Sequence, residues 1–120
     1  MLDLNSIMLG TSQIEVMASF YEKVFGKAGD MVEDGWHGWQ VGSCFIGIGT
    51  HSEVKDSAKE PARIMFNLST KEVKEEFDRI KDIEGVKVIK EPYEMGGAWI
   101  ATLADPDGNF FQLMTPWEDK

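Results

Sequence analysis

The stretch that decides the fold is SIMLGTSQIEV at residues 6–16, because the chain repeats its pattern 57 positions later as RIMFNLSTKEV at residues 63–73. Ile, Met, Ser, Glu and Val recur in the same order, and Phe20 is matched by Phe77. Two copies of a pattern in 120 residues indicate one supersecondary unit used twice, since a solenoid needs about three or more copies to cover its faces. Two such units usually leave a cleft between them, where small molecules bind.

Each copy changes from a strand pattern to a helix pattern. Apolar residues alternate with other residues over 6–11 and 63–68, which predicts a short strand in each copy. The following SQIE (residues 12–15) and STKE (residues 69–72) fit capping boxes, in which the serine caps the first turn and the glutamate bonds back to it. Helices are therefore predicted to begin at both boxes, and the first is predicted to end at Gly26.

The remainder of each copy is apolar and punctuated by glycines. Residues 31–49 and 86–115 each have room for three short strands. The polar segment between the copies ends in proline and is interpreted as a linker. The predicted organisation is one α+β domain over residues 1–120, with repeat one (1–50), a linker (51–61) and repeat two (62–120), each repeat being a βαβββ unit.

Composition excludes several classes of function. With 21 acidic and 12 basic side chains the net charge is −9, which argues against a nucleic-acid partner because phosphate binding needs a basic surface. No apolar run is long enough to span a membrane, and Met1 is not followed by the basic and apolar regions of a secretion signal, so we expect a cytoplasmic location. The single cysteine, Cys44, lies in an apolar run and is interpreted as a buried structural thiol.

The paired βαβββ units, together with FYEKVFG at residues 20–26 and ADPDGNFFQL at residues 104–113, resemble the vicinal oxygen chelate superfamily. This superfamily includes glyoxalase I, extradiol dioxygenases, and fosfomycin- and bleomycin-resistance proteins. The resemblance covers nearly the whole chain and implies a cupped mixed β-sheet with helices on its convex side, a ligand cavity on its concave side, and a homodimer. Function varies widely among the members, so the fold does not decide the activity.

The resemblance also implies where a divalent metal would be held, by side chains on the first and last strands of each unit. The matching positions are Ser6, Gly47, Arg63 and Gln112. None of them is a histidine or a carboxylate, and the fixed positive charge of Arg63 would repel a cation. We therefore expect no family-type metal and no other cofactor. The alternative is a relocated metal site built from His37, His51 and either Glu33 or Asp34.

Aromatic residues crowd the segment GWHGW at residues 35–39. The indole faces of Trp36 and Trp39 suit stacking on a flat or cationic ligand, with His37 as a polar handle, and core packing is the alternative for one of the indoles. Alternation places Trp36 and His37 on opposite faces, so a regular strand directs only one of them into the cup. Trp99 is a further candidate for the cup, and core packing is again its alternative.

Arg63 is the charged candidate. If alternation extends over residues 63–68, Ile64, Phe66 and Leu68 face the helix, and Arg63, Met65 and Asn67 face the cavity. A buried arginine needs a partner, because an unpaired charge out of water is costly. The candidate partners are Glu33, Asp34, Glu94 and an anionic group on the ligand.

Two functions of different classes follow from these residues. The first is a small-molecule-binding protein of the bleomycin-resistance kind that lacks the family metal. The alternative is a glyoxalase- or dioxygenase-type enzyme, a lyase or isomerase, with a relocated metal or with metal-free acid–base chemistry by His37 and either Glu94 or Tyr93. The predicted ligand-binding residues are Ser6, Met8, Trp36, His37, Trp39, Gly47, Arg63, Met65, Trp99 and Gln112. The expected partners are a small molecule and a second copy of the chain, with no nucleic acid and no membrane.

Overall fold

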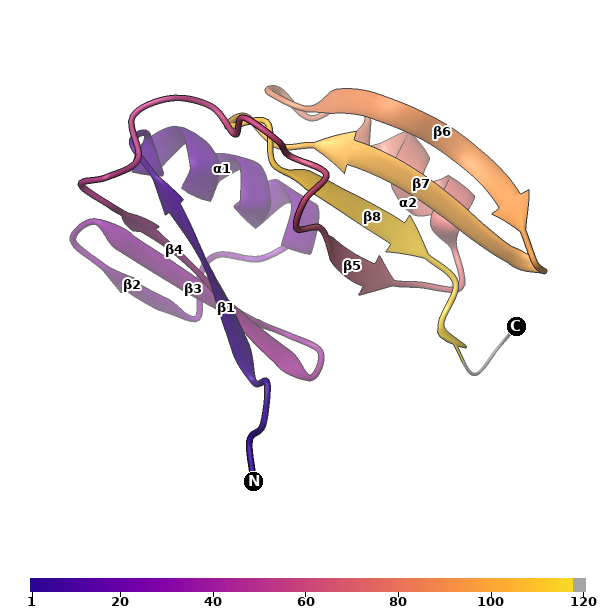
Figure 1. Cartoon of the computed structure of the whole chain (residues 1–120), viewed down its shortest axis with the longest axis horizontal. Helices are drawn as coiled ribbons and strands as arrows, with labels where there is room; N and C mark the ends of the chain where they lie inside the picture. The colour runs from indigo at the N-terminus through magenta and orange to yellow at the C-terminus, as the bar shows by residue number, and fades with distance from the viewer. Residues whose placement is uncertain (118–120) are drawn as a thin grey trace. The chain divides into compact units, whose positions relative to one another are not determined.

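The computed structural model describes residues 1–117 and divides the chain into two compact units, Met1–Asp56 and Ser57–Lys120. The boundary falls inside the segment predicted as a linker, and the last three residues of predicted repeat two, 118–120, lie outside the described residues. Each unit has one helix and four strands in the order βαβββ (Figure 1). The predicted α+β class and the repeated βαβββ order are therefore confirmed.

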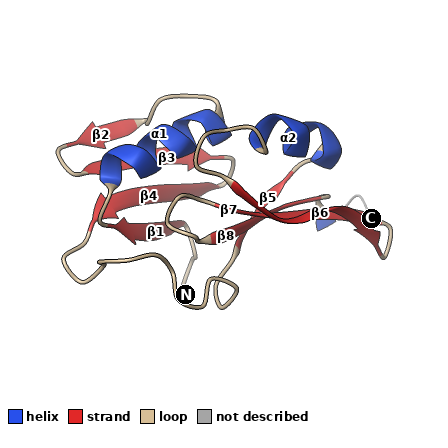
Figure 2. Cartoon of the chain, turned by 90° about the horizontal axis from the view of Figure 1, so that it is seen from above, coloured by secondary structure: helices blue, strands red, loops and turns tan. Residues whose placement is uncertain are grey.

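The first unit packs one helix on a four-stranded sheet. Its elements are β1 (Ser6–Thr11), α1 (Ile14–Phe25), β2 (Met31–Glu33), β3 (Trp36–Val41) and β4 (Cys44–Thr50). The strand order is β1-β4-β3-β2, with β1 parallel to β4 and the other neighbours antiparallel. Figure 2 shows α1 on one side of this sheet, and Met17 and Tyr21 of α1 and Ile48 of β4 are fully buried. The sequence predicts a buried Cys44, but this residue is only half-buried at the start of β4.

The second unit repeats this arrangement. Its elements are β5 (Phe66–Ser69), α2 (Val73–Ile80), β6 (Lys87–Met95), β7 (Ala98–Ala104) and β8 (Phe110–Met114). The strand order is β5-β8-β7-β6, with β5 parallel to β8. Phe77 and Ile80 of α2 are buried, as are Leu103, Phe111 and Leu113 of the sheet. No helix within residues 1–117 is long and apolar enough to cross a membrane.

The predicted capping boxes are wrong at both helices. The N-cap residues are Gln13 and Glu72, and neither makes a side-chain cap hydrogen bond. Instead, Thr11 Oγ1 accepts a hydrogen bond from the backbone N–H of Gln13 at 3.0 Å, and Thr70 Oγ1 accepts one from the N–H of Glu72 at 3.0 Å. In each unit, the threonine two residues before the N-cap residue therefore forms the turn that leads into the helix. Ser12 and Ser69, which the sequence predicted as caps, do not take part in this turn.

The helix starts also correct the spacing of the repeat. They lie at Ile14 and Val73, which are 59 positions apart, and the two threonine contacts have the same spacing. The 57-residue spacing of the sequence echo is therefore two residues too short. It follows that the residue equivalent to Ser6 is Met65, and that the prediction of Arg63 at this position is wrong.

Candidate functional site

The pairing of the strands sorts the predicted site residues of the first unit onto two faces. Directly paired residues of neighbouring strands point to the same side of a sheet. Trp39 pairs with Ile46 and His37 pairs with the fully buried Ile48, so both lie on the face covered by α1. Trp36 pairs with Gly49 and lies on the opposite face. We call this the open face of the first sheet. Its other side chains are those of Ser6, Met8, Met31, Glu33, Gln40 and Phe45.

On this open face the indole of Trp36 extends over three glycines. A Cβ added at Gly47 would lie 2.8 Å from Trp36 Cζ2, and one added at Gly49 would lie 2.7 Å from Trp36 Cδ1. A Cβ at Gly38 would meet Phe45 as well as the Trp36 ring. Side-chain atoms essentially never approach this closely, so only glycine allows the indole to rest on the backbone here. The three glycines form a floor for Trp36.

The floor carries a small apolar surface. The rings of Trp36 and Phe45 are stacked, with centroids 5.9 Å apart and planes 22° apart. Both are half-buried, and the exposed side chain of Met8 reaches the same place, with its Cε 3.1 Å from a Cβ built at Gly49. We call Met8, Trp36 and Phe45 the aromatic platform. Sequence reasoning missed Phe45, although the alternating glycines of the neighbouring strand signal a face without side chains.

Trp39 and His37 belong to the structure of the unit and not to its open face. Trp39 is fully buried, its ring centroid lies 5.6 Å from that of Phe25 on α1, and its Nε1 donates a hydrogen bond to the carbonyl oxygen of Lys27 at 2.9 Å. The His37 ring stacks on Trp39 at 6.0 Å and 19°. These contacts attach the end of α1 to the sheet. Trp39 therefore packs in the core, which the sequence analysis gave as the alternative to ligand stacking.

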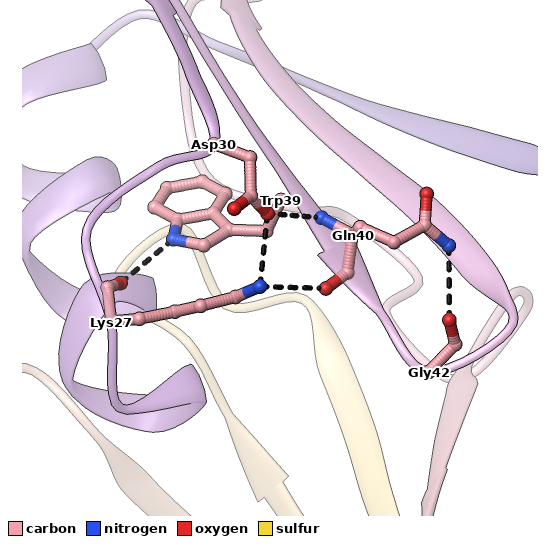
Figure 3. A network of polar contacts seen from close by, with 5 residues as sticks. All are labelled: Lys27, Asp30, Trp39, Gln40 and Gly42. Carbon is pink, nitrogen blue, oxygen red and sulfur yellow. Dashed lines mark hydrogen bonds and ion pairs between the residues drawn. The ribbon is translucent and has the colours of Figure 1, made fainter.

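A polar network holds the same corner of the fold (Figure 3). Asp30 Oδ2 accepts a hydrogen bond from the backbone N–H of Gln40 at 2.7 Å and pairs with Lys27 Nζ at 3.0 Å. The hydrogen bond from Gln40, followed by the contact with Lys27, lowers the pKa of the Asp30 carboxyl. A carboxyl with a lowered pKa stabilises the fold above its ordinary pKa, and this contribution is lost as the pH falls through the lowered value. The network is exposed, so its contribution is small.

In the second unit, Arg63 lies on the surface. Its Nη2 is 2.7 Å from Glu60 Oε1, and both side chains are 70% exposed. The prediction of a buried arginine paired with Glu33, Asp34 or Glu94 is therefore wrong. The reason is that β5 begins only at Phe66, so the alternation of a strand does not extend back to Arg63 or to the exposed Ile64. Arg63 instead lines a shallow cavity of about 380 Å³ together with Glu60, Pro61, Ala62 and Phe110.

Gln112 and Trp99 lie on opposite faces of the second sheet. Gln112 pairs with Thr102 and Trp99 lies three residues before Thr102 on β7, an odd number of positions away. The ring of Trp99 faces α2, with Lys74 Nζ 3.8 Å from its centroid. Trp99 therefore does not share a face with Gln112. Met65 immediately precedes β5 and is partly exposed.

The positions that the resemblance assigns to a metal hold poor ligands. With the corrected spacing they are Ser6 and Gly47 in the first unit, and Met65 and Gln112 in the second. A hydroxyl, a glycine, a thioether and an amide do not fit a divalent metal of the usual nitrogen and carboxylate type. Within residues 1–117 no three His, Cys, Asp or Glu side chains lie together in a way that could hold a metal ion. The alternative set of His37, His51, Glu33 and Asp34 is therefore not assembled.

Comparison with known proteins agrees with this fold. The sequence model described as Glyoxalase/Bleomycin resistance protein/Dioxygenase superfamily matches residues 3–113. A solved glyoxalase-related enzyme from Fulvimarina pelagi is 19% identical, with a TM-score of 0.78, over 97% of this chain and 89% of that one. A glyoxalase/bleomycin resistance protein/dioxygenase family enzyme from Burkholderia phytofirmans PsJN is 26% identical, with a TM-score of 0.70, over 95% and 98%.

A mutant of glyoxalase I from Zea mays is 21% identical, with a TM-score of 0.73, over 93% of this chain. The match spans only 46% of the Zea mays chain. No curated protein sequence matches the chain. Since the family model covers nearly the whole sequence, the chain belongs to the glyoxalase/bleomycin resistance protein/dioxygenase superfamily.

Proposed function

We propose that the protein binds a small apolar or aromatic molecule, without a metal, and that the ligand lies against the aromatic platform. The observation that supports this is the placement of Trp36. One face of its indole rests on the glycine floor, and the side chain is still half-exposed on a face that no helix of its unit covers. Of the predicted ligand-binding residues of the first unit, Ser6, Met8, Trp36 and Gly47 lie on this face, whereas His37 and Trp39 lie on the face covered by α1.

The platform has the chemistry that a flat ligand needs. Aromatic pairs contribute roughly 0.5–1.5 kcal/mol beyond the area that they bury. The flexible thioether of Met8 adapts to ligands of different outline, as methionines do in binding surfaces that accept several partners. Because the glycines hold the indole from beneath, Trp36 loses little freedom when a ligand covers it, which reduces the entropic cost of binding.

Ligand binding is expected to depend on Trp36. A panel of aromatic, cationic and anionic metabolites is screened by quenching of tryptophan fluorescence, and each hit is measured by calorimetry on variants. Trp36→Ala should weaken a hit by about tenfold or more, which corresponds to roughly 1.4 kcal/mol. Trp99→Phe, on the face toward α2, is the control and should leave the affinity unchanged. A panel without any hit, or hits that bind Trp36→Ala as tightly as the wild type, would contradict the proposal.

The protein is also expected to bind no transition metal tightly. After dialysis against metal-free buffer, elemental analysis should find far less than one equivalent of zinc, nickel, manganese or iron, because none of the four ligand positions supplies an imidazole or carboxylate. The test variant is Gln112→Ala, and Gln40→Ala is its control on the other unit. Stoichiometric metal that is retained by Gln40→Ala and lost by Gln112→Ala would show that the family site is in use.

The alternative function is an enzyme of the glyoxalase or dioxygenase type. Its acid–base chemistry requires His37, and the His37 ring stacks on Trp39 on the face covered by α1. The homodimer and the cytoplasmic location, both expected from the sequence, stay predictions; sedimentation over a wide concentration range tests the first of them.

A further inference from the structure

A row of polar side chains crosses the second sheet from edge to edge. The strand register pairs Asn67 of β5 with Gln112 of β8, Gln112 with Thr102 of β7, and Thr102 with Lys90 of β6. Paired residues share a face, so Asn67, Gln112 and Thr102 lie in one line. The register of β6 shifts on both sides of Lys90, so the face of Lys90 is decided by its contacts. We call Asn67, Gln112, Thr102 and Lys90 the polar row.

The polar row lies on the face opposite α2. Phe111 and Leu113, on either side of Gln112, are buried with the residues of α2, so Gln112 points the other way. Lys90 stays on this side, since its Nζ lies 5.4 Å from the ring centroid of Tyr93, and Tyr93 pairs with Ile100, two residues from Thr102.

Two charged residues of β6, Lys90 and Glu94, lie on opposite faces of the second sheet. Lys90 pairs with Thr102 on the face opposite α2, whereas Glu94 pairs with Trp99, which faces α2. No member of the polar row is acidic, although the chain as a whole has a net charge of −9. The row is therefore a place where the positive charge of a lysine is not cancelled within the row.

The central pair of the row is fixed by a hydrogen bond. Gln112 Nε2 donates to Thr102 Oγ1 at 3.1 Å, and Thr102 is only 7% exposed. A hydroxyl that accepts this bond still has its own hydrogen to donate, and the lysine ammonium has three. Donors beside a positive charge match an anionic oxygen, for which charge-assisted hydrogen bonds are the strong type.

We propose that the polar row binds an anionic oxygen group of a small molecule, a carboxylate or a phosphate, directly through Lys90 and the Gln112–Thr102 pair. All four residues of the polar row belong to the second unit, so this site is proposed in its own right and its test does not depend on the aromatic platform. At Gln112 the resemblance implies a group that holds a cation. An amide tied to a threonine beside a lysine favours the opposite charge, so the ligand's own oxygen takes the place of a metal.

The test uses probes that share one ring and differ in charge. Benzoate, phenyl phosphate and neutral benzamide are titrated into the isotopically labelled full chain, and backbone amide shifts are followed by NMR. Benzoate or phenyl phosphate should shift the signals of β7 and β8 saturably, and benzamide should bind about tenfold or more weakly. The tighter of the two anions identifies the group as carboxylate or phosphate. Equal affinity for benzoate and benzamide, or no saturable shift with either anion, would overturn the proposal.

Point variants test this site separately from the aromatic platform. Lys90→Met should weaken the anion by about tenfold, and Lys74→Met, which makes the same charge change beside α2, should not. Gln112→Glu adds a negative charge to the row and should abolish anion binding, with the spread of amide signals confirming that the variant is folded. Unchanged anion affinity in Lys90→Met rejects the polar row, whereas unchanged affinity of fluorescence hits in Trp36→Ala rejects the platform.

Discussion

Trp39→Ala is expected to lower the free energy of unfolding by about 3–5 kcal/mol, the usual cost of removing a fully buried tryptophan. Trp36→Ala, three residues away, is expected to cost less than about 2 kcal/mol. Trp39 is 0% exposed, packs on Phe25 and donates a hydrogen bond to the Lys27 carbonyl, so its loss leaves both a cavity and an unpaired acceptor. Trp36 is half-exposed and loses mainly its contacts with Phe45 and the glycine floor.

Urea denaturation followed by far-UV circular dichroism measures both variants without depending on tryptophan emission. Trp39→Phe serves as a further control, because it keeps a six-membered aromatic ring and removes the hydrogen bond. The loss of stability should then lie near the low end of the range given for Trp39→Ala. Equal losses for Trp36→Ala and Trp39→Ala would mean that the two faces of the first sheet are buried alike, and would remove the basis for the aromatic platform.

The order of the elements was predictable because each depends on local patterns. Strand alternation, the glycine at the end of α1 and the room for three strands after each helix are all local. The spacing of the repeat was not predictable from residue identity. The 57-residue echo matches Val16 with Val73, but Val16 is 48% exposed and Val73 is 3% exposed. Two residues are equivalent in the fold when they have the same burial and the same position relative to the turn into the helix. Two segments can therefore have similar amino acids and still differ in burial and in their position relative to this turn.

The sequence allows a partial prediction of which side chains lie on which face of the first sheet. A two-residue turn at Gly42 and Ser43 pairs Val41 with Cys44, and counting outward from there sets Trp36 opposite Gly49. Alternation then separates Trp36 from His37, as predicted. Local sequence patterns do not predict which face of the sheet α1 covers, because that depends on how the helix packs against the strands.

The start of β5 could not be read from local pattern. A strand exists where it has a partner, and β5 pairs with β8 only from Phe66 opposite Phe111 onward. Residues 63–65 alternate like a strand but have no paired partner in β8. Arg63 is consequently free of the sheet and pairs with Glu60, close by in the chain.

In the second unit, Asp105→Ala is expected to lower the free energy of unfolding by about 2–4 kcal/mol, since buried N–H groups left without an acceptor cost roughly 1–3 kcal/mol each. The Asp105 carboxylate is 3% exposed and accepts hydrogen bonds from the backbone N–H of Asp107 at 2.9 Å and of Asn109 at 3.0 Å. Its Oδ2 also accepts from Asn109 Nδ2 at 3.0 Å. These bonds close the turn between β7 and β8, at Gly108 with its φ of 87°.

The same urea experiment measures this variant against two controls. Asp105→Asn keeps one acceptor oxygen and should lose less, and Asp82→Ala, an exposed carboxylate on the same unit, should stay within about 0.5 kcal/mol of the wild type. The turn also sets the register that brings Gln112 opposite Thr102, so Asp105→Ala should weaken benzoate binding even under conditions where the variant is folded. A variant as stable as Asp82→Ala would show that the register of β7 and β8 is held by their own side-chain packing, and that the turn merely follows it.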